Sequence, residues 1–315
     1  MTLFPLHKIP PLLAMTALAA CVQTQVAMSP RPQAAPARPA VAAALPETTK
    51  SAAARIYFAE VQRALLSQGL LRTDGGGRDT PFNARMLAEN FVRIALYDEY
   101  GRDGAGFVRG EVPSILRRWE TPVKVQLFFG ASVPAERKAT DRARISSYLA
   151  RLSAATGHPI SLVDSGGNFS VHIVSEDERE ALGPALRSEL PGLSAQDISD
   201  VTAMPRTTYC MVYALSPGNT GTYTRAVAVI RAEHPDLLRQ SCFHEEIAQG
   251  LGLANDSPRA RPSIFNDDEE FALLTKMDEL LLKILYDPAL RPGMTVDEAK
   301  PVVETIARRL MGGES

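Results

Sequence analysis

The chain contains few of the residues that cross-link small folds or bind metals. Among 315 residues there are 3 Cys, 5 His and 1 Trp. This scarcity excludes a disulfide-dense fold, and it excludes a zinc array built from paired CxxC motifs. The chain also lacks a surplus of charge, because 34 Lys+Arg and 36 Asp+Glu give a formal net charge of -2. We therefore expect no nucleic-acid partner, since proteins that bind nucleic acid usually carry a basic surplus or patch.

The remaining composition is that of a globular protein, and an export signal precedes it. Hydrophobic residues make up 45% of the chain and charged residues 22%, which suits a folded core. Residues 1–20 carry Lys8 and no acidic residue, and most of this segment is apolar. This layout predicts a secretory signal peptide that is too short to span a membrane.

The signal peptide ends in Leu18-Ala19-Ala20-Cys21. This ending resembles a bacterial lipobox, which implies that Cys21 is lipidated and becomes the mature N-terminus. A plain signal peptide with an Ala-x-Ala cleavage site is the alternative. Val22, rather than Asp, follows the cysteine. By resemblance to lipoprotein sorting rules, this implies an exported protein anchored at the periplasmic face of the outer membrane.

Residues 21–50 are rich in Ala, Pro and Gln and predict a flexible, lipid-anchored linker. Such a segment has too few bulky apolar groups to fold, and its prolines keep it extended. A tether between a lipid anchor and a folded domain makes the membrane one expected partner. An envelope protein or peptidoglycan is a second expected partner, but no motif selects either.

The two cysteines that remain after Cys21 are Cys210 and Cys242. An even number of cysteines in an oxidising compartment predicts one disulfide between them. Two buried free thiols are the alternative.

Hydrophobic periodicity predicts an α+β fold with a mixed or antiparallel sheet. We expect two N-terminal helices that form a hairpin within residues 51–109, followed by a sheet domain over residues 110–315. The expected helices are 51–72, 83–97, 134–156, 235–251, 267–286 and 296–311, and the expected strands are 123–127, 160–163, 169–174, 209–215 and 226–232.

One expected helix carries the chemistry that the sequence offers. Glu245 and Gln249 stand four residues apart and share a helix face, with Glu246 beside them. Asn255 and Asp256 follow in a turn. We expect an acidic cleft lined by Glu245, Glu246, Gln249 and Asp256, and Glu246 is the candidate general base. The plainer interpretation is that these polar side chains form hydrogen bonds to helix ends and within a buried network, without binding a ligand.

This helix resembles the zinc-peptidase pattern HExxHxLGL, aligned through Gln249-Gly250-Leu251-Gly252-Leu253. The resemblance to zincins implies a zincin-like sheet, with Glu245 and Gln249 at the two histidine positions and Glu246 at the catalytic glutamate. Asn255 falls at the third ligand position. Neither histidine position holds a histidine, and three protein ligands, mostly imidazoles, are what catalytic zinc requires. The pattern therefore predicts no zinc, while a divalent metal of harder type stays possible.

Four further segments resemble an exported bacterial family that carries domain of unknown function 2927, over residues of about 110 to 311. These segments are Arg118-Trp119-Glu120-Thr121-Pro122, Cys242 to Leu253, Ser263-Ile264-Phe265-Asn266-Asp267 and Leu285 to Met294. This family carries no established activity. Two functions follow as expectations: a cell-envelope lipoprotein that has lost zinc hydrolysis and acts in binding or structure, or a peptidase-like hydrolase that uses Glu246 with a non-standard or weakly bound metal.

Overall fold

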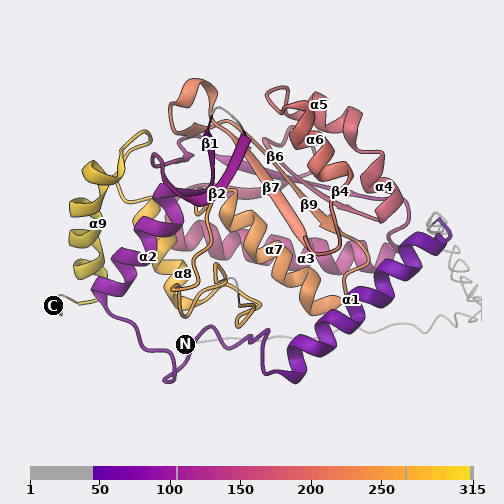
Figure 1. Cartoon of the computed structure of the whole chain (residues 1–315), viewed down its shortest axis with the longest axis horizontal. Coiled ribbons are helices and arrows are strands. Elements are labelled where there is room, and N and C mark those ends of the chain that lie inside the picture. The colour runs from indigo at the N-terminus through magenta and orange to yellow at the C-terminus, as the bar shows by residue number, and fades with distance from the viewer. Residues whose placement is uncertain (1–44, 104–105, 267, 313–315) are drawn as a thin grey trace, which may run out of the picture. The chain divides into compact units, whose positions relative to one another are not determined.

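A five-stranded sheet with the order β5-β4-β6-β9-β7 forms the centre of the fold (Figure 1). Four strands run parallel, and the edge strand β7 runs antiparallel to β9. The strands are β4 (Val123–Phe129), β5 (Ile160–Val163), β6 (Phe169–Val174), β7 (Cys210–Leu215) and β9 (Arg225–Arg231). The sheet is mixed, and the predicted α+β class is confirmed.

The computed structural model describes residues 45–312 except 104–105 and 267. These described residues belong to one compact unit. The predicted signal peptide, the lipidation site Cys21 and the linker as far as residue 44 lie outside the described residues.

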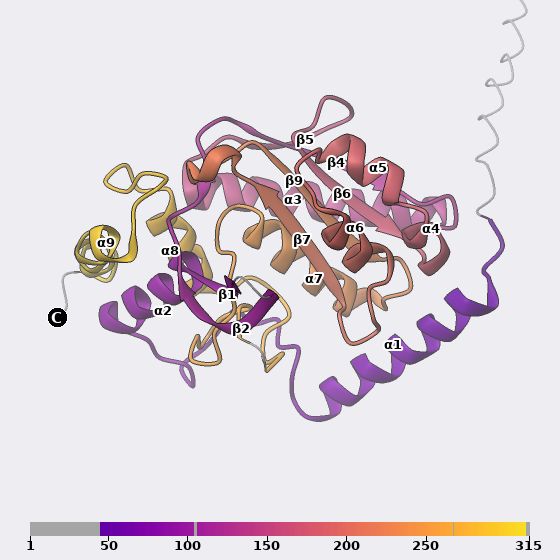
Figure 2. The ribbon, with the colours of Figure 1, turned by 45° about the horizontal axis from the view of Figure 1, so that its top comes forward.

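Helices cover both faces of the sheet (Figure 2). One face packs against α3 (Ala135–Thr156) and α7 (Asp236–Gln249). The short helices α4 (Glu176–Glu180), α5 (Gly183–Glu189) and α6 (Ala195–Thr202) connect β6 to β7 and cover the other face. No helix among the described residues is long and apolar enough to cross a membrane.

Strand β9 shows why the sheet is buried on both sides. Its side chains alternate, so that Ala226, Ala228 and Ile230 join the main core while Val227 and Val229 join a second core under α5 and α6. A strand with two apolar faces belongs in the middle of a layered structure. The near-continuous hydrophobic sequence of this strand therefore matches its position between β6 and β7.

The two N-terminal helices pack in different places. α1 (Thr49–Ser67) contacts α4, whereas α2 (Ala84–Leu96) packs against α8 (Lys276–Leu285) and α9 (Val296–Leu310). The prediction of an N-terminal helical hairpin is therefore wrong. The physical reason is that the buried face of each helix finds a larger apolar surface elsewhere: Phe58 of α1 packs with Leu238, and Phe91 of α2 lies in the main core.

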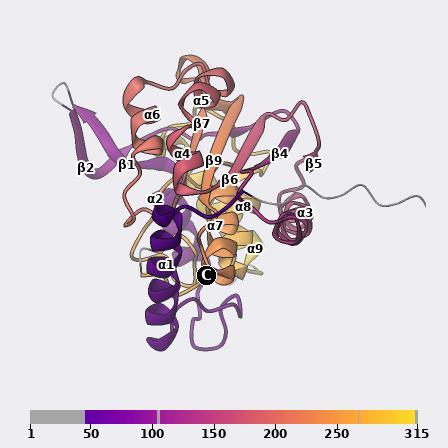
Figure 3. The ribbon, with the colours of Figure 1, turned by 90° about the vertical axis from the view of Figure 1, so that its right-hand side faces the viewer.

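A β-hairpin follows α2, in a segment where the sequence predicts neither a helix nor a strand. β1 (Tyr97–Asp103) and β2 (Gly106–Pro113) pair antiparallel, and Figure 3 shows this hairpin reaching away from the sheet. A short parallel pair, β3 (Arg118–Trp119) with β8 (Thr222–Tyr223), and the single turn η1 (Pro217–Asn219) complete the connections.

Helix α8 begins at Lys276, nine residues later than predicted, because Asp278 organises the chain before it. The buried Asp278 carboxylate accepts hydrogen bonds from the Thr275 backbone N–H (2.8 Å), the Ser263 hydroxyl (2.5 Å) and the Ile264 N–H (3.1 Å). The Thr275 side chain caps the helix in return. These bonds hold Ser263 and Ile264 against the start of α8, which explains the Ser263-Ile264 segment noted in the sequence.

Candidate functional site

Helix α7 places the candidate site beneath strands β7 and β9. It follows directly from β9 through residues 232–235. Its apolar stripe is buried: Phe243 is 1% exposed, and Ile247 and the following Leu251, just past the helix end, are 0% exposed. At 25 cal/mol per Å² of apolar surface, roughly, each such side chain stabilises the fold by about 2 kcal/mol. The helix therefore has a fixed rotation, and its polar residues face defined directions.

Two other segments, around Trp119 and around Tyr286, hold the C-terminal end of α7. The Trp119 indole N–H donates to the Gly250 carbonyl (2.8 Å), and the Tyr286 hydroxyl donates to the Leu251 carbonyl (3.1 Å). Gly252 has φ 129°, and a Cβ on it would lie 2.2 Å from the Arg117 carbonyl oxygen. Only glycine fits there. The motifs around Trp119, Leu251 and Tyr286 thus meet at one place in the structure.

The predicted acidic residues come together on the α7 face that points to β7. Carboxylate oxygens of Glu245 and Glu246 and the Cys210 sulfur lie within 4.8 Å of one another. The Gln249 amide donates to Asp256 Oδ1 at 3.2 Å. Four of the predicted positions therefore form one polar cluster at the C-terminal half of the helix.

Glu246 is the most constrained member of this cluster. Its side chain is 3% exposed, and its Oε2 atom is buried without a hydrogen-bond partner among the described residues. Burial and the neighbouring negative charge of Asp256 raise the pKa of the Glu246 carboxyl well above its usual value of 4.5. A carboxyl in this environment favours its neutral form.

The predicted disulfide is present. Cys210 and Cys242 are bonded, with their Cα atoms 5.9 Å apart. The bond joins the start of β7 to α7, one helical turn before Glu246. Because the Cys210 sulfur is part of this bond, it is not a thiolate and does not offer a metal the ligand that a free cysteine would.

Asn255 is held by a different part of the fold. Its side-chain amide donates to the Arg93 carbonyl (3.1 Å), and its backbone N–H donates to the Ile94 carbonyl (3.0 Å). Both contacts lie at the end of α2. The structure therefore uses Asn255 to attach the turn after α7 to α2, and its buried Oδ1 has no partner among the described residues.

His244 points away from the acidic cluster. Its ring stacks on Tyr148 of α3 with 3.9 Å between centroids, and its Nδ1 accepts a hydrogen bond from the Leu274 N–H at 3.0 Å. Burial and the charge of Arg151 lower the pKa of His244 to about 3. The imidazole is therefore neutral and fully used in packing.

The other histidines of the folded part lie elsewhere. His158 Nε2 lies 2.8 Å from the Thr121 carbonyl oxygen, and His172 Nε2 lies 3.0 Å from Glu189 Oε2. His234 is 0% exposed and packs against the Phe58 ring at 4.4 Å. In the described part of the chain, the cluster around Glu246 thus supplies carboxylates and an amide but no imidazole, a donor set that does not fit zinc.

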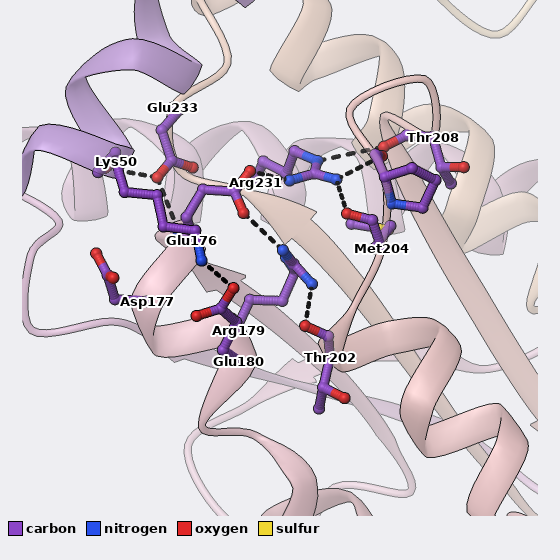
Figure 4. A network of polar contacts seen from close by, with 12 residues as sticks. Lys50, Glu176, Asp177, Arg179, Glu180, Thr202, Met204, Thr208, Arg231 and Glu233 are labelled. Carbon is purple, nitrogen blue, oxygen red and sulfur yellow. Dashed lines mark hydrogen bonds and ion pairs between the residues drawn. The ribbon is translucent and has the colours of Figure 1, made fainter.

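A second polar cluster lies at the other end of α7 and was not predicted. Figure 4 shows Glu176 between the guanidinium groups of Arg179 and Arg231. All three side chains are nearly inaccessible to solvent, as is that of Glu233. Burial lowers the pKa of Arg231 to about 10. Glu176 and Arg179 share α4 at an i,i+3 spacing, but Arg231 ends β9 and Glu233 follows it, so sequence spacing alone does not predict this cluster.

The fold and site define an α+β protein whose long buried helix carries a carboxylate-amide cluster. The family described as "Protein of unknown function (DUF2927)" matches residues 84–305. The chain therefore belongs to the DUF2927 family. No curated protein matches the chain.

Proposed function

We propose that the protein is a lipid-anchored protein of the bacterial cell envelope, whose zincin-like domain does not hydrolyse peptides with zinc and acts in binding or structure. Two observations support a zincin-like ancestry. The mixed sheet has one antiparallel edge strand, β7, and the last parallel strand, β9, leads directly into helix α7. The polar positions of α7 occupy the spacing of the zinc-peptidase helix.

The donor set at α7 is the observation that carries the proposal. Glu245 and Gln249 stand where a zinc peptidase needs imidazoles, and the nearby sulfur of Cys210 is locked in a disulfide. Glu246 favours the neutral form, which neither accepts a proton from water nor binds a metal well. The cluster suits a structural or ligand-binding role better than proton transfer.

A second candidate function is hydrolysis with a hard divalent metal, and the unpartnered Glu246 Oε2 atom favours it. Oxygen donors from carboxylates and amides are the ligands that Mg²⁺ and Ca²⁺ prefer. Glu245 and Gln249 would hold the ion, which would supply a Lewis acid, and Glu246 would act as the general base. This function also requires Glu246 to lose its proton in a buried position, which is unfavourable.

Metal content and turnover of the purified chain separate these functions. We expect no stoichiometric zinc, manganese or calcium by elemental analysis, and no hydrolysis of generic peptides above the level of Glu246→Gln. The exposed Glu60→Gln variant is the matched control. Bound metal together with turnover that Glu246→Gln abolishes and Glu60→Gln retains would overturn the proposal in favour of the hydrolase.

The membrane anchor has its own test. We expect the expressed chain to fractionate with outer membranes and to carry a diacylglycerol-sized mass increment at Cys21. The Cys21→Ala variant is expected to leave the membrane fraction. Membrane association that persists in Cys21→Ala, or a mature N-terminus other than Cys21, contradicts the anchor.

A further inference from the structure

A pocket of about 380 Å³ lies where three parallel strands of the sheet end. Its walls include residues that follow β4 (132–134), β6 (175–178) and β9 (232–233), and residues 45–55 at the start of α1 close it. In sheets of parallel strands, ligands bind beyond the carboxyl ends of the strands. This pocket is at the N-terminal end of α7, so it is separate from the Glu246 cluster.

Arg137 is the cationic group of this pocket that has no acidic partner. It lies in the first turn of α3, half-buried, and its Nη1 donates to the Ala232 carbonyl at 2.9 Å. Among the described residues, no carboxylate oxygen lies within 4.0 Å of an Arg137 guanidinium nitrogen, the distance that would make an ion pair. Arg55 in the same pocket is different, because it donates to Glu47 at 2.8 Å and 3.0 Å.

The electrostatic surroundings of Arg137 are mixed. Burial, followed by the charge of Arg239, lowers the pKa of Arg137 below its usual value, while the charges of Asp141 and Asp236 act in the opposite direction. An anion beside this guanidinium would restore a pairing that the protein itself does not provide. The N-terminus of α3, whose cap residue Pro134 makes no side-chain cap bond, adds backbone N–H donors on the same side.

Glu233 is the second incompletely paired group that lines the pocket. Its side chain is 3% exposed, and its Oε1 accepts from the Ser51 hydroxyl (2.6 Å) and the Glu176 N–H (2.8 Å). Its Oε2 is buried without a partner among the described residues. The residue follows Ala232, whose carbonyl binds Arg137, so both incompletely paired groups stand at one place on the pocket wall.

The charges around the pocket select the ligand. Two basic side chains, Arg55 and Arg137, face four acidic ones: Glu47, Asp177, Glu178 and Glu233. A dianion such as phosphate would be repelled by these acids, whereas one carboxylate is matched by Arg137 alone. The acidic side chains then suit an ammonium or amide N–H on the same ligand. The volume is at the small end of the range for ligand pockets.

We propose that this pocket binds an amino-acid-type ligand, with its carboxylate on Arg137 and its nitrogen toward the acidic wall. A free amino acid and the C-terminal residue of a peptide share this chemistry. The proposal does not depend on what α7 does, because the two sites use different residues. The ligand would contact both the family-matched domain and α1, which precedes it.

Calorimetric titration of the purified full chain tests the pocket. The probes are alanine, alanyl-alanine, alanyl-alanine amide, N-acetyl-alanine and inorganic phosphate. We expect binding of alanine or alanyl-alanine, and at least about tenfold weaker binding of the amide, which lacks the carboxylate. Stronger binding of alanine than of the dipeptide identifies a free amino acid as the ligand, and the reverse order identifies a peptide C-terminus.

Substitutions assign the site to Arg137. We expect Arg137→Gln to weaken binding about tenfold or more and Arg137→Lys to weaken it less. Arg142→Gln is the matched control, because Arg142 lies on the same helix, is exposed and pairs with Asp164. Thermal melting checks that each variant is folded. If Arg137→Gln does not fold, the test rests on Arg137→Lys.

Four results would overturn the proposal. They are no binding of any carboxylate probe at millimolar concentration, equal binding of the dipeptide and its amide, tighter binding of phosphate, and an equal loss in Arg142→Gln. Glu246→Gln is expected to leave binding unchanged, so that failure of this proposal is distinguishable from failure of the function proposed for α7.

Discussion

Tyr148 contacts His244 twice: its hydroxyl donates to the His244 carbonyl at 2.7 Å, and its ring lies on the imidazole with 3.9 Å between centroids. The pair joins α3 to α7 on the side opposite the acidic cluster. This contact explains why His244, next to Glu245, belongs to the core. Because the contact fixes the rotation of α7, substitutions in the pair test that rotation.

Tyr148→Phe keeps the stacked ring and removes the hydrogen bond. We expect the free energy of unfolding to fall by about 1 kcal/mol, because the His244 carbonyl loses one partner in a buried place. Urea denaturation measures the change. Tyr57→Phe on α1 is the control and is expected to change stability by less than about 0.5 kcal/mol. Equal effects of the two substitutions would contradict the assignment.

His244 is expected to make the protein less stable as pH falls below 6.5. The unfolded chain takes up a proton near pH 6.5, while the folded protein resists protonation of His244 until about pH 3. Stability from this group is therefore complete above pH 6.5 and is lost towards pH 3, with a slope of up to about 1.4 kcal/mol per pH unit.

His244→Gln isolates this effect from carboxyls such as Glu246, whose raised pKa acts in the opposite direction. Its destabilising effect, measured by urea denaturation, is expected to shrink as pH falls from 6.5 towards 3. Tyr148→Phe is the control, since it removes a contact but no group that titrates in this range. A cost of His244→Gln that is the same at all pH values would refute the prediction.

Loss of the disulfide is expected to lower the free energy of unfolding by about 2–4 kcal/mol. The bond closes a separation of 32 residues between Cys210 and Cys242 and joins β7 to α7. The double variant Cys210→Ala/Cys242→Ala and chemical reduction should give similar losses in denaturant melts. Cys21→Ala, the control, should melt like the parent chain, and unchanged stability after reduction would show that the bond does not constrain the fold.

Phe58 anchors α1, and its removal should release that helix. It is 0% exposed and its ring centroid lies 4.4 Å from that of His234, so Phe58→Ala is expected to cost about 3–5 kcal/mol. Limited trypsin digestion should then cleave within α1, at Arg55 and Arg63, faster than in the parent chain. Ile56→Ala is the control, because Ile56 is 56% exposed. Unchanged cleavage in Phe58→Ala would contradict an anchoring role.

The strands and most helices could be predicted because their signals are local. Ile160–Val163 and Phe169–Val174 are found with the expected bounds, since a proline and a glycine-rich turn delimit short apolar runs. The delayed start of α8 could not be predicted, because the Asp278 carboxylate binds Ser263, 15 residues away, and replaces helix with loop.

The candidate site also has features that the sequence predicts and features that it does not. Helical periodicity places Glu245 and Gln249 on one face, and the cysteine count indicates the disulfide. The attachment of Asn255 to α2 and the contact of Arg137 with Ala232 depend on residues 162 and 95 positions apart. Such pairings arise only when the chain is folded, so single-sequence periodicity carries no signal for them.

The way α1 is attached has a mechanical consequence. Thr48, the N-cap residue, bonds to Asp177, and in the first turn Lys50 bonds to Glu180 and Ser51 to Glu233. All three partners lie in the segments that follow β6 and β9. A pulling force applied to the chain ahead of residue 45 would act on these bonds one after another, which is a peeling geometry. In a shear geometry the bonds would instead carry the force together. The start of α1 is therefore the part of the described fold that would yield first under a pull from the N-terminal side, well before the disulfide-linked β7 and α7.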